Sequence, residues 1–222
     1  MRWLVCWTCL ACAADAPPSD LRTILEGVPE RFRPEHVVVE IDPRQTGVVA
    51  RPETGSVLVS PRRRGLDRDV WLHEIGHLVA HGPRPEAETA RRLARAIDEA
   101  VADYYAATLT GSPVVGTGAS EARDLSDAPA LRDEAWALLG LPRFDPYPFG
   151  WALAGIWWRM DPFAGALLED LLSCLSSAVF AGRRTPRDVV HALAERCPAR
   201  SRARIARSLA EWIPSELLEE PS

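Results

Sequence analysis

The sequence has no internal repeat, no dense basic stripe and no group of cysteines at the spacing of zinc ligands. Without a basic stripe, and with a net charge of −5, binding to nucleic acid is disfavoured. The apolar run near the N-terminus, roughly a dozen residues, is too short to cross a bilayer as a helix. What the sequence does have is 47% hydrophobic residues over 222 positions, which is enough to bury a sizeable core.

The first fourteen residues differ in composition from the rest of the chain. After Arg2 no charged residue occurs before Asp15, and residues 11–14 are small. A short apolar core followed by small residues is typical of a signal peptide. We therefore predict a signal peptide over residues 1–14, a tether over 15–20, and export of the mature chain. The alternative is a buried N-terminal helix or strand.

Residues 9–12, Cys-Leu-Ala-Cys, resemble a bacterial lipoprotein box. The resemblance implies that Cys12 is lipidated and that the protein is a lipoprotein of the bacterial cell envelope. Its only contact with a membrane would then be this N-terminal lipid anchor. Cleavage after Ala13 or Ala14 by an ordinary signal peptidase would instead give a secreted protein, and the residues leave both routes open.

Export would remove Cys6 and Cys9 with the signal peptide and place the cysteines of the mature chain in an oxidising compartment. Cys174 and Cys197 form an even pair there, so we predict a disulfide between two C-terminal helices. Two unpaired buried cysteines are the alternative.

The hydrophobic pattern changes its period near residue 61. Before that point, β-branched runs predict a strand over 36–41 and a hairpin whose strands, 47–50 and 56–60, flank a Pro/Gly turn. Beyond it, a period of about 3.6 predicts helices, over 70–81, 86–110, 129–139, 148–160, 162–180, 187–196 and 199–212. We therefore predict an α+β fold, in which a small N-terminal antiparallel sheet packs on a larger helical body, as a single domain over 21–222.

Local signals add detail to this outline. Asp69 is suited to cap the helix that starts at Val70, and Thr185 with its following proline is typical of a capped helix start. A short helix is predicted over 21–32, and residues 116–127 are predicted to form a loop.

The run His73-Glu74-Ile75-Gly76-His77 is the strongest functional signal in the sequence. Residues four apart share one face of a helix, so both imidazoles can reach one metal ion. Glu74 can take a proton from a water molecule bound to that ion. We therefore predict His73 and His77 as zinc ligands and Glu74 as the general base.

The next predicted helix supplies a third ligand. Catalytic zinc takes three protein ligands and keeps one open position. Glu99 and Asp103 lie on one helix face, far enough beyond His77 for an antiparallel return. We predict that Glu99 binds the metal while Asp103 accepts the outer ring N–H of one histidine. The alternative is that both acids are solvated surface residues.

The two helices together resemble the gluzincin metallopeptidases, whose pattern is His-Glu-x-x-His followed by Glu-x-x-x-Asp on a second helix. Residues 99–113 are similar to predicted secreted bacterial metallopeptidases, and the resemblance extends over residues 36–160. The metzincin pattern does not fit, because its third histidine would fall where Pro83 stands.

The resemblance implies two further roles. In such enzymes the strand nearest the cleft offers backbone groups to an extended peptide, a role that falls on Val57, Leu58, Val59 and Ser60. Related proteins commonly have a downstream histidine that steadies the oxyanion, and Tyr147 stands in its place. Its phenol could donate the same hydrogen bond, or it could be a buried structural tyrosine.

The function predicted from these residues is zinc-dependent hydrolysis of peptide bonds in a peptide or protein substrate, by an endopeptidase with Zn²⁺ as cofactor. The rival function, from another class of protein, is that of a surface lipoprotein that binds zinc but does not hydrolyse peptides. The missing downstream histidine is the reason to consider it. A helical interaction module with a chance motif is the third alternative.

Overall fold

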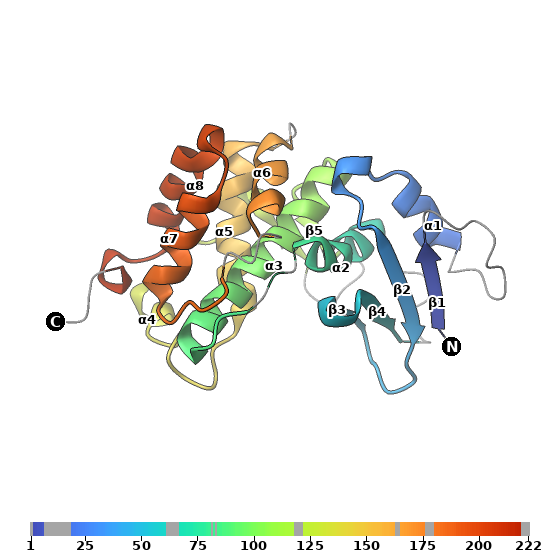
Figure 1. Ribbon diagram of the computed structural model, residues 1–222, viewed down its shortest axis with the longest axis horizontal. Coiled ribbons are helices and arrows are strands. Elements are labelled where there is room, and N and C mark those ends of the chain that lie inside the picture. Colours follow the sequence, from blue (N-terminus) through green and yellow to red (C-terminus); the bar gives the residue numbers. More distant parts are fainter. Residues whose placement is uncertain are drawn as a thin grey trace.

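The computed structural model describes residues 2–6, 19–60, 67–80, 82, 84–117, 122–162, 165–175 and 180–218. In the described residues, a small sheet lies on the N-terminal side, most of the later elements are helices, and a long helix, α3, lies between the two parts (Figure 1). The α+β class predicted from the sequence is therefore confirmed.

The strands and helices occur in the following order. The strands are β1 Arg2–Cys6, β2 His36–Ile41, β3 Val48–Arg51, β4 Ser56–Val59, β5 Val114–Val115 and β6 Arg123–Asp124. The helices are α1 Ser19–Glu26, α2 Arg68–Ala80, α3 Glu88–Thr110, α4 Asp133–Trp136, α5 Pro146–Met160, α6 Ala166–Leu175, α7 Pro186–Arg196 and α8 Ala199–Trp212. Short 3-10 turns are η1 Glu30–Phe32, η2 Pro52–Thr54, η3 Leu125–Asp127 and η4 Ser215–Leu217.

The main sheet has the strand order β1-β2-β4-β3, so β3 lies at an edge and β4 lies inside. β1 pairs antiparallel with β2, and β3 with β4, but β2 and β4 run parallel. This pairing differs from the predicted antiparallel sheet. The chain reverses twice between β2 and β4, once after Ile41 and once after Arg51, so the two strands run in the same direction.

Part of the predicted signal peptide belongs to this sheet. Residues 2–6 form β1, which runs along β2 from Arg2 opposite Glu40 to Cys6 opposite His36. The lipidation candidate Cys12, like the rest of residues 7–18, lies outside the described residues. The signal peptide and export stay predictions. No described helix combines the length and the apolar character that a membrane span requires.

Helix α3 is the centre of the helical body. It packs against both α2 and α5, and seven of its fourteen buried residues are alanines, whose small side chains let neighbouring helices approach. Two buried tyrosines fix it to distant parts of the chain. The hydroxyl of Tyr104 donates to Asp161 O, and that of Tyr105 donates to Phe32 O, each at 2.7 Å.

Two glycines mark the closest approaches to α3. A Cβ at Gly76 of α2 would lie 2.8 Å from Ala102 Cα, and a Cβ at Gly150 of α5 would lie 2.6 Å from Glu99 Cβ. Carbon atoms in a packed interior do not approach so closely, so the observed helix spacing needs glycine at both positions.

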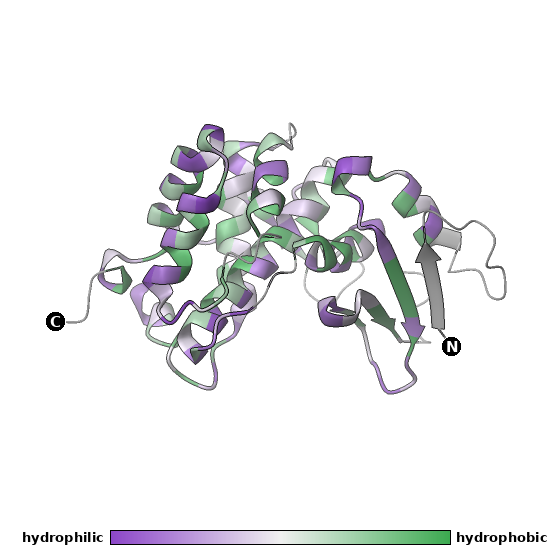
Figure 2. Ribbon diagram, viewed as in Figure 1, coloured by the Kyte–Doolittle hydropathy of each residue, from purple (hydrophilic) through white to green (hydrophobic). Residues whose placement is uncertain are grey.

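The C-terminal helices are held by a disulfide and by apolar faces. Cys174 of α6 and Cys197 at the end of α7 are joined, with their Cα atoms 5.0 Å apart, which confirms the predicted pair. Figure 2 shows hydrophilic and hydrophobic residues alternating around α7 and α8, as in helices with one buried face. Thr185 and Asp188 form the capping box that starts α7.

Several local expectations need correction. Helix α2 begins at Arg68, so Asp69 lies in its first turn instead of capping it, and its carboxylate accepts hydrogen bonds from Thr117. The loop predicted over 116–127 contains β6 and η3, because a two-residue strand is too short to show a period. The predicted helix over 21–32 is interrupted before Pro29, and α4 is shorter than its predicted range.

The close crossing of α2 and α3 predicts the effect of Gly76→Ala. Alanine in an ordinary helix position stabilises relative to glycine by about 0.5–1 kcal/mol. Here the added methyl would meet the backbone of Ala102, so we expect the free energy of unfolding to fall by about 1–3 kcal/mol. Urea unfolding measures this change.

Gly47→Ala is the matched control for this prediction, because a Cβ at Gly47 would meet no atom within 4 Å. We expect its stability to stay within about 0.5 kcal/mol of the wild type. A Gly76→Ala protein as stable as the wild type would contradict the close packing.

Candidate metal centre

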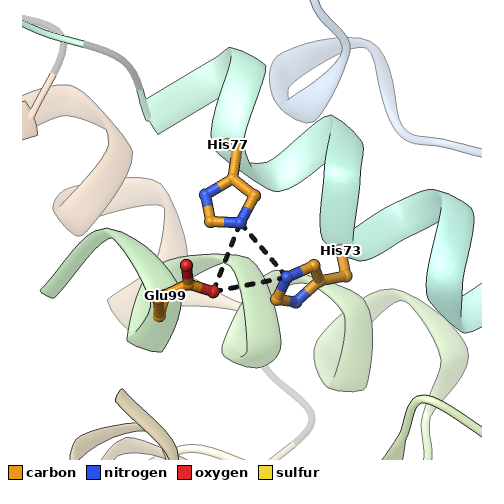
Figure 3. Close-up of side chains that lie close together, drawn as sticks. All are labelled: His73, His77 and Glu99. Carbon is orange, nitrogen blue, oxygen red and sulfur yellow. Dashed lines mark hydrogen bonds and ion pairs between the residues drawn. The ribbon is translucent and has the colours of Figure 1, made fainter. Parts of the chain in front are cut away.

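Helix α2 presents His73 and His77 on one face, and α3 presents Glu99 opposite them (Figure 3). The two imidazole Nε2 atoms lie 3.1 Å apart. Each lies 3.5 Å from Glu99 Oε2. All three side chains are buried, and they form a site that can hold a metal ion.

The outer nitrogen of each imidazole contacts a carboxylate. Nδ1 of His73 lies 2.8 Å from Asp103 Oδ1, and Nδ1 of His77 lies 3.0 Å from Asp98 Oδ2. Since an ionised carboxylate can only accept, each Nδ1 carries a proton, and each Nε2 faces the centre, where its lone pair can bind a metal once Nε2 is deprotonated.

The position predicted for Asp103 is therefore confirmed. Asp98 was not identified from the sequence. On α3, Asp98 lies five residues before Asp103, which is about 1.4 turns at 3.6 residues per turn. The four-residue spacing of the histidines therefore points from Asp103 to Glu99, and it does not identify Asp98.

The three inner atoms have the spacing of ligands around a metal ion. Ligands bonded to zinc at about 2.0–2.1 Å in a tetrahedron lie roughly 3.3 Å from one another. The observed separations of 3.1 and 3.5 Å are close to this value. Glu99 Oε2 is buried and has no hydrogen-bond partner among the described residues. A divalent cation would satisfy this oxygen and both nitrogen lone pairs, so the residues fit a metal.

Arg123 holds the outer end of this network from strand β6. Its Nε donates to Asp103 Oδ2 at 2.8 Å, and its Nη2 donates to Oδ1 at 2.6 Å. Burial raises the pKa of Asp103, but His73 and Arg123 together lower it below its ordinary value. Asp103 is almost fully buried, and its charge is compatible with burial because it has two cationic or donor partners. The sequence carried no periodic signal for Arg123.

Ion pairing overrides burial at the inner groups. Burial lowers the pKa of His73, but the carboxylates of Asp103 and Glu99 raise it overall to about 9. Burial also opposes charge on His77, yet Asp98 and Glu99 hold its pKa well above the ordinary value. Burial raises the pKa of Glu99, but the two histidines lower it overall. In metal-free protein the imidazoles therefore hold protons, which a metal ion must displace.

Glu74 faces the same cleft from the turn of α2 that carries His73. Its Oε2 accepts a hydrogen bond from Ala50 N of β3 at 2.6 Å. Burial raises the pKa of Glu74 above its ordinary value. The cleft has a volume of about 220 Å³, and Glu74 lines it together with the metal ligands. The structure thus places a carboxylate of raised pKa beside the metal site.

The strand beside the cleft is β3, not β4. Val57, Leu58, Val59 and Ser56 of β4 pair with β2 on one side and with β3 on the other, and Ser60 N donates to Gly47 O. The expectation that residues 57–60 offer free backbone groups is therefore wrong. The sequence indicated the hairpin but not which of its strands lies at the edge of the sheet. Val48, Val49 and Ala50 of β3 line the cleft instead.

Tyr147, in the first turn of α5, lines the same cleft. Its side chain is half exposed, at 46%, and Arg123 Cζ lies 5.9 Å from its ring centroid. The negative charge of Glu99, followed by burial, raises the pKa of Tyr147, so the phenol keeps its proton at neutral pH. The structure thus places this hydrogen-bond donor near the metal ligands, and the alternative of a buried structural tyrosine does not hold.

Comparison of the chain with protein-family models, curated proteins and solved structures gave no match. A function for this protein must therefore be argued from the geometry of the site.

The contact between Asp98 and His77 predicts a loss of metal affinity in Asp98→Asn. An amide oxygen accepts a weaker hydrogen bond from Nδ1–H than a carboxylate does, so the imidazole becomes a weaker and less oriented ligand. We expect the dissociation constant for Zn²⁺ to rise by about 10–100-fold, measured by competition with a chromophoric chelator. The Asp98 side chain is 26% exposed, so the amide that replaces its carboxylate can still contact water.

Asp133→Asn is the control for this measurement, because Asp133 lies exposed on α4, away from the cleft. If the dissociation constant of Asp98→Asn for Zn²⁺ lies within about twofold of that of this control, the proposed role of Asp98 is wrong.

The raised pKa of His73 predicts how the stability of metal-free protein depends on pH. Its pKa is about 9 in the folded protein, against an ordinary value of 6.5 in the unfolded chain. Because the folded state binds the proton more tightly, the contribution of His73 to stability is fully present below pH 6.5 and is lost as the pH rises through about 9. We expect urea unfolding to give a lower free energy above pH 9 than at pH 6.5.

Zinc saturation should remove this fall, because a nitrogen that binds metal does not titrate. The variant His73→Gln/His77→Gln shows what other groups contribute. A metal-free wild type with equal stability at both pH values would be inconsistent with the raised pKa.

Proposed function

We propose that the protein is a zinc-dependent peptidase of the gluzincin type. The observation that carries the proposal is the convergence of His73 Nε2, His77 Nε2 and Glu99 Oε2 at 3.1–3.5 Å, in a cleft that also contains the Glu74 carboxylate. A site that only stored a metal for stability would have no need of a carboxylate of raised pKa beside it.

The donor set favours zinc over harder cations. Two imidazoles and one carboxylate are the protein ligands of many catalytic zinc sites, whereas magnesium and calcium take oxygen ligands. His73, His77 and Glu99 would hold the ion and leave one position toward the cleft. When bound, Zn²⁺ acts as a Lewis acid that polarises a carbonyl group and lowers the pKa of water toward about 7.

In this proposal, Glu74 moves the proton. Its raised pKa suits a group that accepts a proton from the attacking water and then returns it to the leaving amine. The hydrogen bond from Ala50 N keeps the carboxylate oriented into the cleft. Tyr147 would donate a hydrogen bond to the carbonyl oxygen of the substrate as that oxygen gains negative charge.

The edge strand β3 is the proposed docking site for the peptide. Ala50 N points away from β4, since it donates to Glu74. Val48 is two residues earlier, so its backbone groups point the same way. An extended substrate can add to this edge as another strand, in the role first assigned to residues 57–60. Because an edge accepts a chain along its length, we propose endopeptidase action.

Glu74→Gln tests the proposed chemistry. The amide cannot take a proton, so we expect kcat/KM for a peptide library to fall by about 10²–10⁴-fold. Glu74 is not a metal ligand in this proposal, so elemental analysis should still find about one zinc per chain. Glu99→Gln, in contrast, should lose zinc.

Glu134→Gln, on the exposed face of α4, is the control and should keep both zinc and activity. Hydrolysis by Glu74→Gln at the wild-type rate would exclude Glu74 as the base. A wild type that binds zinc but hydrolyses no peptide would favour the alternative of an inactive zinc-binding surface protein.

A further inference from the structure

The cleft contains two cationic side chains that the proposed chemistry does not use, Arg84 and Arg95. Both also line a smaller cavity of about 30 Å³ beside the metal site, which they share with Asp98. The other residues around this cavity are mostly apolar, from the end of α2, from α3 and from the chain near α6, and include Ala80, Ala94, Leu175 and Phe180. The two hollows therefore meet at the arginines.

Arg95 lies one turn before Glu99 on α3, so it faces the cleft from the helix that carries the third metal ligand. It forms no hydrogen bond or ion pair with any residue in the described part of the chain. Its charge reaches Tyr147, whose pKa it acts to lower. An exposed guanidinium with five donors and no partner is suited to bind an anion.

Arg84 has only a weak partner. Its Nη2 lies 3.7 Å from Glu53 Oε1, in a pair whose side chains are 48% and 62% exposed. Ion pairs at such exposure contribute little and exchange readily. A carboxylate arriving in the cleft can therefore compete with Glu53 for Arg84.

The anionic groups of the cleft do not cancel these cations. Asp98 is engaged by His77, and Glu74 accepts a hydrogen bond from Ala50 N. Glu99 faces the two imidazoles. Each carboxylate thus has a closer partner than an arginine.

We propose that Arg95, with Arg84, forms a carboxylate-binding subsite beside the metal centre, so that peptides with a carboxylate at this position are the preferred substrates. The inference rests on the proposed peptidase function. A guanidinium binds a carboxylate through two parallel hydrogen bonds. The carboxylate is either a Glu or Asp side chain near the scissile bond or the free C-terminus of the peptide.

Peptide binding to zinc-loaded Glu74→Gln protein tests the subsite without requiring turnover. One arm scans a single Glu, against Gln, through a neutral peptide with blocked ends. A second arm compares a free C-terminus with an amidated one. We expect one arm to show about tenfold tighter binding of the carboxylate form by calorimetry, a preference of the size that a charge-assisted contact gives.

Arg95→Gln, introduced into the same protein, should reduce the ratio of the two affinities to about one, whereas Arg95→Lys should keep part of it. Arg207→Gln, an exposed position on α8 outside the cleft, is the matched control and should keep the full ratio. Equal affinities of the acid and amide forms in both arms, or a preference that survives Arg95→Gln, would overturn the subsite.

Hydrolysis by the wild type separates the two proposals. Turnover without any acid preference overturns the subsite and leaves the peptidase standing. No turnover, together with an Arg95-dependent preference in binding, supports the subsite and removes the peptidase.

Discussion

The close crossing of α2 over α3 is the constraint on which the site depends. At Gly76 the backbones approach until a methyl group has no room, and His73 and His77 lie on either side of that point. The short distance lets imidazoles from one helix and carboxylates from the other meet directly. Gly150 brings α5 equally close to Glu99, so α5 packs directly against the residue that faces the histidines.

The charges at this crossing form a layered arrangement. Glu99 lies innermost with the two imidazoles, Asp98 and Asp103 lie behind the rings, and Arg123 lies behind Asp103. Each buried carboxylate contacts a group of opposite or potential positive charge, which offsets the cost of removing it from water. The inner oxygen of Glu99 alone has no hydrogen-bond donor, and this asymmetry indicates where a cation belongs.

The site residues that could be predicted are those related to one another by the spacing within a helix, on α2 and on α3. His73, Glu74 and His77 follow from helical spacing, and Glu99 and Asp103 from the chemistry of a third ligand on an antiparallel helix. The structure confirms where these side chains lie, and confirms the α+β class and the disulfide. Arg123 and the edge position of β3 depend on how a two-residue strand and a hairpin dock, which no local pattern encodes.

Helix α3 carries the third ligand, both acids that orient the histidines, and the free arginine of the cleft. These groups share a single helical register. Each residue of an α-helix turns the chain by about 100°, so inserting or deleting one residue between Asp103 and Tyr104 would rotate all four groups relative to the tyrosines that fix the helix. Related sequences that keep this site should therefore carry their length differences outside α3, in the connections on either side of it.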